Sequence, residues 1–224
     1  MLTLLAGAFL ISLAGGFGTH ILPWTVLFLL SAAALLKLRL EDGWGEAGWF
    51  ERRPAWTLFF LCLTAYLSTF RWHGGDDIPN SLLPYAILGH GTVTFDPFPD
   101  WAARENMRDL VIFSRGHWIS TYPIAPGILA LPLYVLPVLF RVVPTDIFLH
   151  NLAKIAGAAF TAVSVVVCYR ILERRCSRRW AGAVALLYAF GTYAFSVSSQ
   201  ALYSHGIAQL GVAGLRFVIQ PFVT

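Results

Sequence analysis

Seven long apolar runs divide the sequence, and they constrain its fold more than any other feature. A helix of roughly 20 apolar residues can cross the hydrocarbon core of a bilayer. Only 12% of the 224 residues are charged, about half the share that is usual in soluble domains. The runs cover residues 2–17, 21–38, 55–70, 124–140, 147–169, 180–197 and 206–219. This pattern predicts an all-α, polytopic transmembrane protein.

The basic residues predict its orientation, because Lys and Arg concentrate in the cytoplasmic loops of membrane proteins. One group flanks the loop between the second and third runs: Lys37, Arg39, Arg52 and Arg53. A second group crowds the loop after the fifth run: Arg170, Arg174, Arg175, Arg178 and Arg179. We therefore expect both loops to be cytoplasmic. The net charge of +4 is explained by this distribution, so we expect no nucleic acid as a partner.

The run at 124–140 is an exception among the predicted spans. If it crossed the membrane, the arginines of the following loop would lie outside, against the charge rule. It also contains four prolines in or next to it, and interior prolines kink helices: Pro123, Pro126, Pro132 and Pro137. We expect an interfacial or re-entrant helix on the outer side. The chain then divides into transmembrane helices at 1–72, an extracytoplasmic loop with juxtamembrane helices at 73–146, and further transmembrane helices at 147–224.

An acidic pair, Asp76 and Asp77, opens this extracytoplasmic loop just ahead of Pro79. Carboxylates before a proline suit a helix N-terminus, where they cap free N–H groups and favour the helix dipole. The alternative is that one Asp is a general base or a metal ligand, because adjacent like charges raise one pKa and so favour proton transfer. Asn80 would lie on the same helix face. The residues alone leave both interpretations open.

Other polar residues are candidates for binding. Arg115 and His117 could hold a phosphate or serve as interfacial anchors. Lys154, near the start of a predicted span, is costly there and therefore a functional candidate, or it extends its charge to the surface. His205 lies at the next outer turn, where an ordinary structural role is the alternative. No zinc spacing, nucleotide-binding loop or disulfide framework is present in the sequence.

The order of these features resembles the integral-membrane glycosyltransferases of the type C fold, which include protein O-mannosyltransferases and the aminoarabinose transferase of lipid A. Three segments carry the resemblance: the acidic pair after a span, "TYPIAPGILALPLY" at 121–134, and "YRILERRCSRRW" at 169–180. The pair differs from the usual Asp-Glu of that family in having Asp77 at the second position. The resemblance implies a multi-pass protein of a prokaryotic plasma membrane. Family members usually have more spans, so we expect a truncated or partial member.

The resemblance also implies a reaction. A sugar would move from a polyprenyl-phosphate donor to an extracytoplasmic acceptor, with Asp76 as general base and Asp77 in support. The expected substrate-binding residues are Asn80, Arg115, His117, Tyr122, Lys154 and His205, with Arg115, His117 or Lys154 neutralising the leaving phosphate. Membrane lipid is the second expected partner, no cofactor is required by the sequence, and a divalent metal is left open. The competing hypotheses are a transporter or flippase-like protein and an inactive fragment of a glycosyltransferase.

Overall fold

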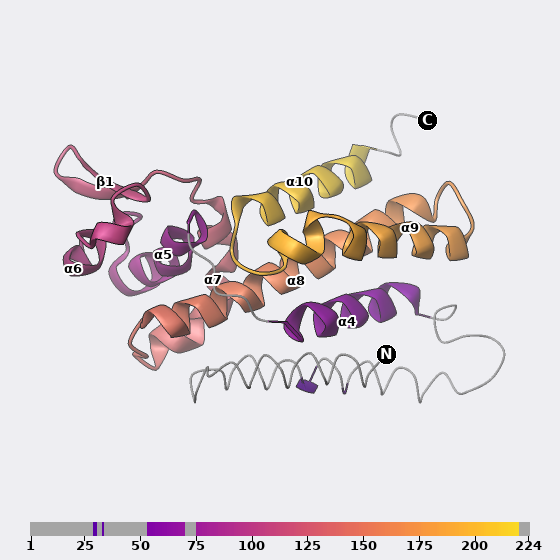
Figure 1. Cartoon of the computed structure of the whole chain (residues 1–224), viewed down its shortest axis with the longest axis horizontal. Helices are drawn as coiled ribbons and strands as arrows, with labels where there is room; N and C mark the ends of the chain where they lie inside the picture. Colours follow the sequence, from indigo (N-terminus) through magenta and orange to yellow (C-terminus); the bar gives the residue numbers. More distant parts are fainter. Residues whose placement is uncertain (1–28, 31–32, 34–52, 70–74, 220–224) are drawn as a thin grey trace.

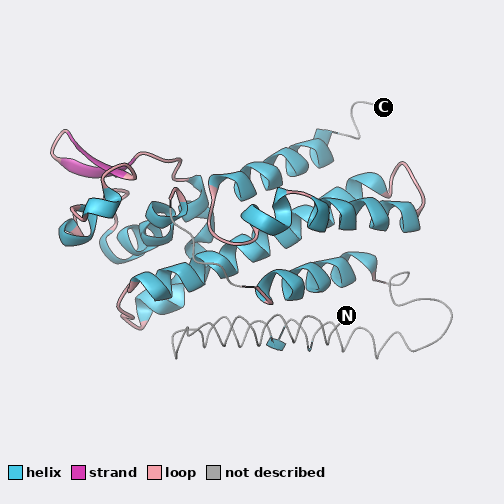
Figure 2. Ribbon diagram, viewed as in Figure 1, coloured by secondary structure: helices cyan, strands magenta, loops and turns pink. Residues whose placement is uncertain are grey.

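The computed structural model describes residues 29–30, 33, 53–69 and 75–219, so the first two predicted spans lie almost entirely outside the described residues. The described chain is mostly helical, which agrees with the predicted fold class (Figure 2). Its elements are α4 (Pro54–Leu67), α5 (Asp77–His90), α6 (Pro99–Ala102), the 3₁₀ turn η2 (Glu105–Met107), β1 (Val111–Ser114), β2 (His117–Ser120), α7 (Ala125–Leu139), α8 (Asp146–Leu172), α9 (Arg178–Gly191), the π-helical turn η3 (Ala194–Ser198) and α10 (Ser204–Ile219).

The long helix α8 is the centre of a helical bundle and contacts α4, α9 and α10. Its buried face is rich in small residues: Ala153, Ala156, Gly157, Ala158 and Ala162. The buried alanines of α9 recur at every fourth position: Ala181, Ala185 and Ala189. Small side chains in such rows let helix backbones approach closely. One larger residue adds a polar link, since the Tyr66 hydroxyl of α4 donates a hydrogen bond to the carbonyl of Ala189 at 3.1 Å.

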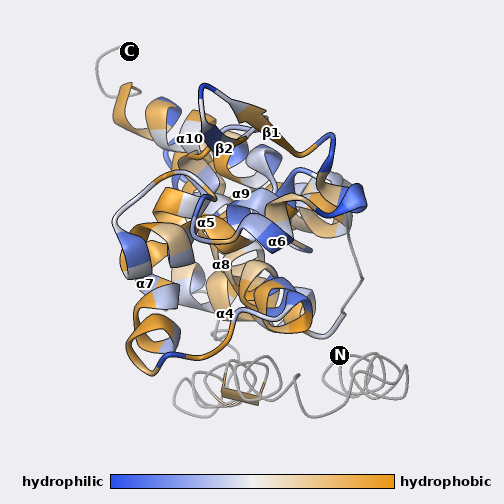
Figure 3. Ribbon diagram, turned by 90° about the vertical axis from the view of Figure 1, so that its left-hand side faces the viewer, coloured by the Kyte–Doolittle hydropathy of each residue, from blue (hydrophilic) through white to orange (hydrophobic). Residues whose placement is uncertain are grey.

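The two ends of the bundle differ in chemical character. The loop between α8 and α9, within the arginine-rich stretch, lies at one end, and α5, α6 and the β1–β2 hairpin lie at the other (Figure 1). Seen from the second end, hydrophilic residues gather around α6 and the neighbouring loops (Figure 3). The acidic pair therefore lies at the end of the bundle opposite to the arginine-rich loop.

Among the described residues, α8 is the one helix that is long and apolar enough to cross a membrane. It has 27 residues, whereas α4 and α9 have 14 each and α10 has 16. The prediction of one continuous helix over 180–197 is wrong. The backbone of Thr192 is extended, and its side chain accepts a hydrogen bond from the N–H of Ala194 at 3.2 Å. The helix therefore stops at Gly191, and the π-helical turn η3 follows.

The proline-rich run forms the short helix α7. Its 15 residues extend about 22 Å at 1.5 Å per residue, less than the hydrocarbon core of about 30 Å. One face packs on α5, where Gly127 permits a close approach, because a Cβ there would lie 3.1 Å from the carbonyl oxygen of Asn80. The other residues of the helix expose a large apolar surface: Ile128, Leu129, Leu133, Val135, Leu136 and Leu139. Helix α7 is therefore shorter than a membrane span and has an apolar outer face.

A β-hairpin, which the all-α prediction missed, projects from the same end of the molecule. Strands β1 and β2 pair antiparallel, with Val111 opposite Ser120 and Ser114 opposite His117. The two residues between the strands, Arg115 and Gly116, both have positive φ, as a type I′ turn requires. Arg115 is therefore a hairpin-turn residue.

Candidate active site

The acidic pair lies at the N-terminus of α5. Asp76 occupies the N-cap position, but its side chain makes no capping hydrogen bond. Its Oδ2 instead accepts a hydrogen bond of 3.0 Å from the hydroxyl of Ser204, at the start of α10. The side-chain amide of Asn80 donates to the backbone carbonyl of Asp76 at 3.1 Å. Capping therefore does not explain the position of the Asp76 carboxylate, which connects two elements far apart in the sequence.

Asp77, the first residue of α5, is buried, with only 1% of its surface exposed. Its Oδ1 has no hydrogen-bond partner among the described residues. Burial raises the pKa of Asp77 to about 6, and the neighbouring charge of Asp76 adds to the increase, although His150 acts in the opposite direction. The carboxyl of Asp77 therefore titrates closer to neutral pH than an ordinary aspartate.

We expect Asp77→Asn to make the protein more stable at pH 7. The pKa of Asp77 rises on folding from 3.8 to about 6, so the folded state binds the proton more tightly. The contribution of Asp77 to the free energy of unfolding is complete below about pH 4 and is lost as the pH rises through about 6. The variant lacks this loss, and its free energy of unfolding at pH 7 should exceed that of the wild type by roughly 1–3 kcal/mol.

Thermal unfolding in detergent between pH 4 and pH 7 measures this effect. Asp100→Asn, at an exposed position on α6, is the matched control and should keep the wild-type pH dependence. If Asp77→Asn were less stable than the wild type at pH 7, the carboxylate would be a stabilising group, contrary to our account.

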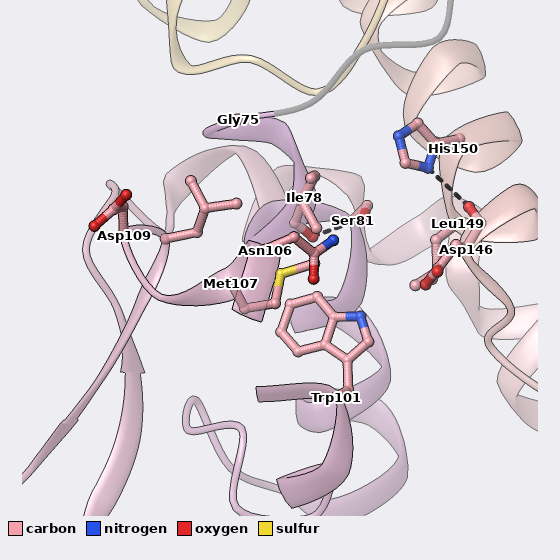
Figure 4. Close-up of a pocket in the computed structure, with 11 residues that line it drawn as sticks. Gly75, Ile78, Ser81, Trp101, Asn106, Met107, Asp109, Asp146, Leu149 and His150 are labelled. Atoms are coloured by element: carbon pink, nitrogen blue, oxygen red, sulfur yellow. Dashed lines mark hydrogen bonds between the residues drawn. The ribbon is translucent and has the colours of Figure 1, made fainter. Parts of the chain in front are cut away.

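A pocket of about 340 Å³ opens next to the acidic pair (Figure 4). Gly75 and Ile78, which flank the pair in the sequence, line the pocket, whereas Asp76 and Asp77 do not. The lining residues are Gly75, Ile78, Ser81, Trp101, Asn106, Met107, Asp109, Leu110, Asp146, Leu149 and His150. They come from α5, the α6–β1 segment and the start of α8. The pocket thus combines an apolar floor with several polar side chains.

His150 connects this pocket to the buried Asp77. Its Nδ1 lies 2.8 Å from the backbone carbonyl oxygen of Asp146. A carbonyl can only accept a hydrogen bond, so Nδ1 carries the proton and Nε2 is the basic nitrogen of the neutral ring. His150 lies in the first turns of α8, and its place in the pocket follows from how α5 packs on α8.

Two predicted phosphate ligands lie on the hairpin. The Asp96 carboxylate accepts a hydrogen bond of 2.8 Å from the N–H of Trp118, and its Oδ2 lies 2.7 Å from Nδ1 of His117. The Trp118 N–H, His117 and the Thr94 hydroxyl together hold the pKa of Asp96 at about 2. His117 therefore fastens the hairpin to the preceding loop, and the exposed Arg115 forms the turn. Neither residue lines the pocket.

Lys154 is fully buried in α8. Its ammonium group donates hydrogen bonds to the carbonyl of Ser199 at 3.0 Å and to Oε1 of Gln200 at 2.8 Å. It does not extend its charge to the surface, and it does not line the pocket. In this structure Lys154 holds the segment between η3 and α10 against α8.

The remaining predicted binding residues are dispersed. Tyr122 is half-buried and packs against the core formed by α5, α7 and α8. His205 is exposed and lines a separate groove of about 540 Å³ between α8, α9 and α10. Of the predicted binding residues, Asn80 is the one that the structure brings into contact with the acidic pair.

Sequence reasoning missed three groups at the site: Trp101, Ser204 and the Arg104–Asp146 ion pair. The chain turns at η2, and the guanidinium of Arg104 contacts Asp146 at 2.9 Å. Trp101 offered a signal only as one of many aromatic residues in the loop. In the part of the chain that the structure describes, no three His, Cys, Asp or Glu side chains gather as metal ligands.

Comparison with known proteins identifies no family for this chain. No protein-family model, no curated protein and no solved structure matches the chain.

Proposed function

We propose that this protein is a polytopic membrane glycosyltransferase that moves a sugar from a polyprenyl-phosphate donor to an acceptor outside the cytoplasm. The observation that carries the proposal is the acidic pair beside a pocket, at the end of the bundle opposite to the arginine-rich loop. Such a concave site with a few convergent polar groups and a perturbed pKa is a typical active site.

In the proposed reaction Asp76 is the general base. It is the more exposed carboxylate of the pair, so it can reach a substrate hydroxyl, and Ser204 fixes its orientation. As the acceptor oxygen attacks the anomeric carbon, its proton passes to Asp76. The bond between that carbon and the phosphate oxygen breaks, and polyprenyl phosphate leaves with its electron pair. Direct displacement inverts the anomeric configuration.

Asp77 supports this step from a buried position next to Asp76. It is too buried to contact a substrate directly, and its raised pKa means that the site resists a second negative charge. Near or below pH 6 a large share of Asp77 is protonated, so the pair then carries less negative charge beside Asp76, the proposed base.

The proposed membrane placement follows from the shape of the bundle. Helices α4, α9 and α10 contact α8 directly. Large apolar side chains that are exposed on these three helices could contact lipid: Trp56, Trp180, Leu187, Val212, Leu215 and Val218. The apolar outer face of α7 suits the interface. In this arrangement the pocket opens at the outer surface.

We expect Asp100→Cys to react with a membrane-impermeant thiol reagent in intact cells and Arg175→Cys to be protected. Both positions are exposed, so the difference depends on the side of the membrane. The background lacks Cys62, Cys168 and Cys176, which are the three native cysteines. Permeabilised cells, in which both positions should react, are the control. Labelling at 175 together with protection at 100 would reverse the proposed topology.

Transfer itself is tested with purified protein in detergent. Polyprenyl-phosphate sugars carrying a radiolabel are supplied with candidate acceptors, and release of polyprenyl phosphate and the anomeric configuration of the product are measured. The proposal expects release above background and an inverted product. Absence of release with every donor, from protein that retains a cooperative thermal transition, would favour a transporter or an inactive protein.

A further inference from the structure

Trp101 presents an unusual polar group in the pocket beside the acidic pair. Its side chain is buried, with 7% exposed, and the indole Nε1–H has no hydrogen-bond partner among the described residues. A buried donor without a partner is costly. The other side of the ring packs against Phe95, at a centroid distance of 5.4 Å. In Figure 4 the indole closes one end of the pocket.

The remaining lining groups offer both donors and acceptors. The Ser81 hydroxyl donates to the carbonyl of Ile78 at 2.7 Å, so its oxygen is left to accept a further hydrogen bond. Asn106 provides an amide and Asp146 a carboxylate, while Asp109 lies at the opposite edge of the lining with its carboxylate directed away from the other labelled side chains (Figure 4). Between them Ile78, Met107 and Leu149 form apolar wall. A sugar ring has apolar C–H faces and hydroxyl groups at its edge, so it matches a pocket with apolar walls and separate polar groups.

The charged residues that line the pocket argue against a negatively charged ligand. The lining contains two carboxylates and one histidine, and no Lys or Arg. The guanidinium of Arg104 is paired with Asp146 at 2.9 Å, and neither residue of the acidic pair lines the pocket. A negatively charged group would be repelled here, and specificity often comes from such repulsion. Neither a phosphate nor a sugar carboxylate fits this environment.

We propose that the pocket formed by α5, the α6–β1 segment and the start of α8 binds a sugar ring without negative charge, with Trp101 donating to a ring hydroxyl. The inference rests on the proposed function, because it names the part of the substrate that the pocket receives. It places the phosphate of the donor outside the pocket. It also predicts that the protein discriminates against uronic acid rings.

Binding of simple glycosides to the full chain tests the proposal independently of transfer. The probes are methyl glucoside and methyl glucuronide, and the method is saturation-transfer NMR in a detergent without a sugar headgroup. The neutral glycoside is expected to bind at least tenfold more tightly than the glucuronide. Equal binding of the two probes, or no binding of the neutral one, would overturn the proposal.

Two variants connect the binding to the pocket. Trp101→Phe keeps an aromatic ring but removes the donor, and it should weaken binding of the neutral glycoside about tenfold without lowering the melting temperature by more than a few degrees. Trp180→Phe, at a 69% exposed position on α9, is the matched control. Asp109→Asn, an exposed substitution, should reduce the preference for the neutral probe several-fold. Unchanged binding in Trp101→Phe together with unchanged preference in Asp109→Asn would place the sugar elsewhere.

The binding and transfer experiments together distinguish failure of the sugar subsite from failure of the proposed transferase activity. Glycoside binding that depends on Trp101, without any sugar transfer, would keep the subsite and refute the transferase. Transfer that is insensitive to Trp101→Phe and that accepts uronate donors as well as neutral ones would keep the transferase and refute the subsite.

Discussion

Asp76→Asn is expected to reduce the rate of sugar transfer by roughly 10²- to 10⁴-fold, the usual contribution of general base catalysis. Asparagine keeps the shape of the side chain, and its amide oxygen can still accept the hydrogen bond from Ser204 that is seen at 3.0 Å. It cannot accept the proton of an acceptor hydroxyl. The measurement is the initial rate of polyprenyl phosphate release at saturating donor, with expression and melting temperature determined on the same preparation.

Asp100→Asn is the matched control for this experiment, because it removes a carboxylate from the same end of the molecule at an exposed position. Its activity should stay within about twofold of the wild type. The melting temperature of Asp76→Asn should also stay close to that of the wild type, since the Asp76 side chain makes no capping hydrogen bond. An active Asp76→Asn protein would refute Asp76 as the general base.

Gly157→Ala is expected to destabilise the protein by about 3 kcal/mol, at the upper end of the usual cost of overpacking. A Cβ at this position of α8 would collide with the backbone carbonyl of Ala201 and lie 3.0 Å from the carbonyl oxygen of Ser198. Backbone atoms cannot move aside as a flexible side chain can. The segment they belong to also carries the two acceptors of Lys154 and leads into Ser204, so activity should fall as well.

Chemical denaturation in detergent measures this effect, with Gly211→Ala as the control. Gly211 lies in α10, and a Cβ there would meet no atom within 4 Å. Because alanine has the higher helix propensity, by about 1 kcal/mol, the control should be neutral or slightly stabilising. If Gly157→Ala were as stable as Gly211→Ala, the segment from η3 to α10 would not pack on α8 as described.

The features that the sequence predicted correctly are those set by local chemistry. The apolar run at 147–169 is continuous and without proline, and it forms most of the long helix α8. The run at 124–140, predicted as an interfacial or re-entrant helix, forms α7, whose 15 residues are too few for a span, while its position at the membrane stays a prediction. The break after Gly191 was missed because it depends on the extended backbone of Thr192 and its side-chain hydrogen bond to Ala194, inside a run that is apolar throughout.

The hairpin could have been predicted. "VIFSRGHWIS" contains two short β-type runs separated by two residues, of which the second is Gly116, and this spacing is a hairpin signal.

The site was predictable only in part. Asp76 and Asp77 were identified because adjacent carboxylates next to a span are conspicuous. Ser204 and His150 could not be placed with them from the sequence, because their proximity depends on how α10 and α8 pack against the start of α5. Lys154 is a residue whose surroundings the sequence could not predict. A lysine in a span is a reasonable functional candidate, but whether its ammonium group faces a substrate or the carbonyl of Ser199 is decided by a loop 45 residues away.

The proposed role of Asp76 at the outer surface is tested most directly by measuring sugar transfer in sealed membrane vesicles of known orientation. A radiolabelled neutral sugar on a short-chain, water-soluble polyprenyl phosphate is added to the outside only, and label in the product and release of polyprenyl phosphate are followed over time. We predict turnover in vesicles whose α6 and hairpin face outward, little turnover in inverted vesicles until they are permeabilised, and loss of both signals in Asp76→Asn. Equal turnover by wild type and Asp76→Asn, or turnover confined to the inverted vesicles, would contradict this prediction.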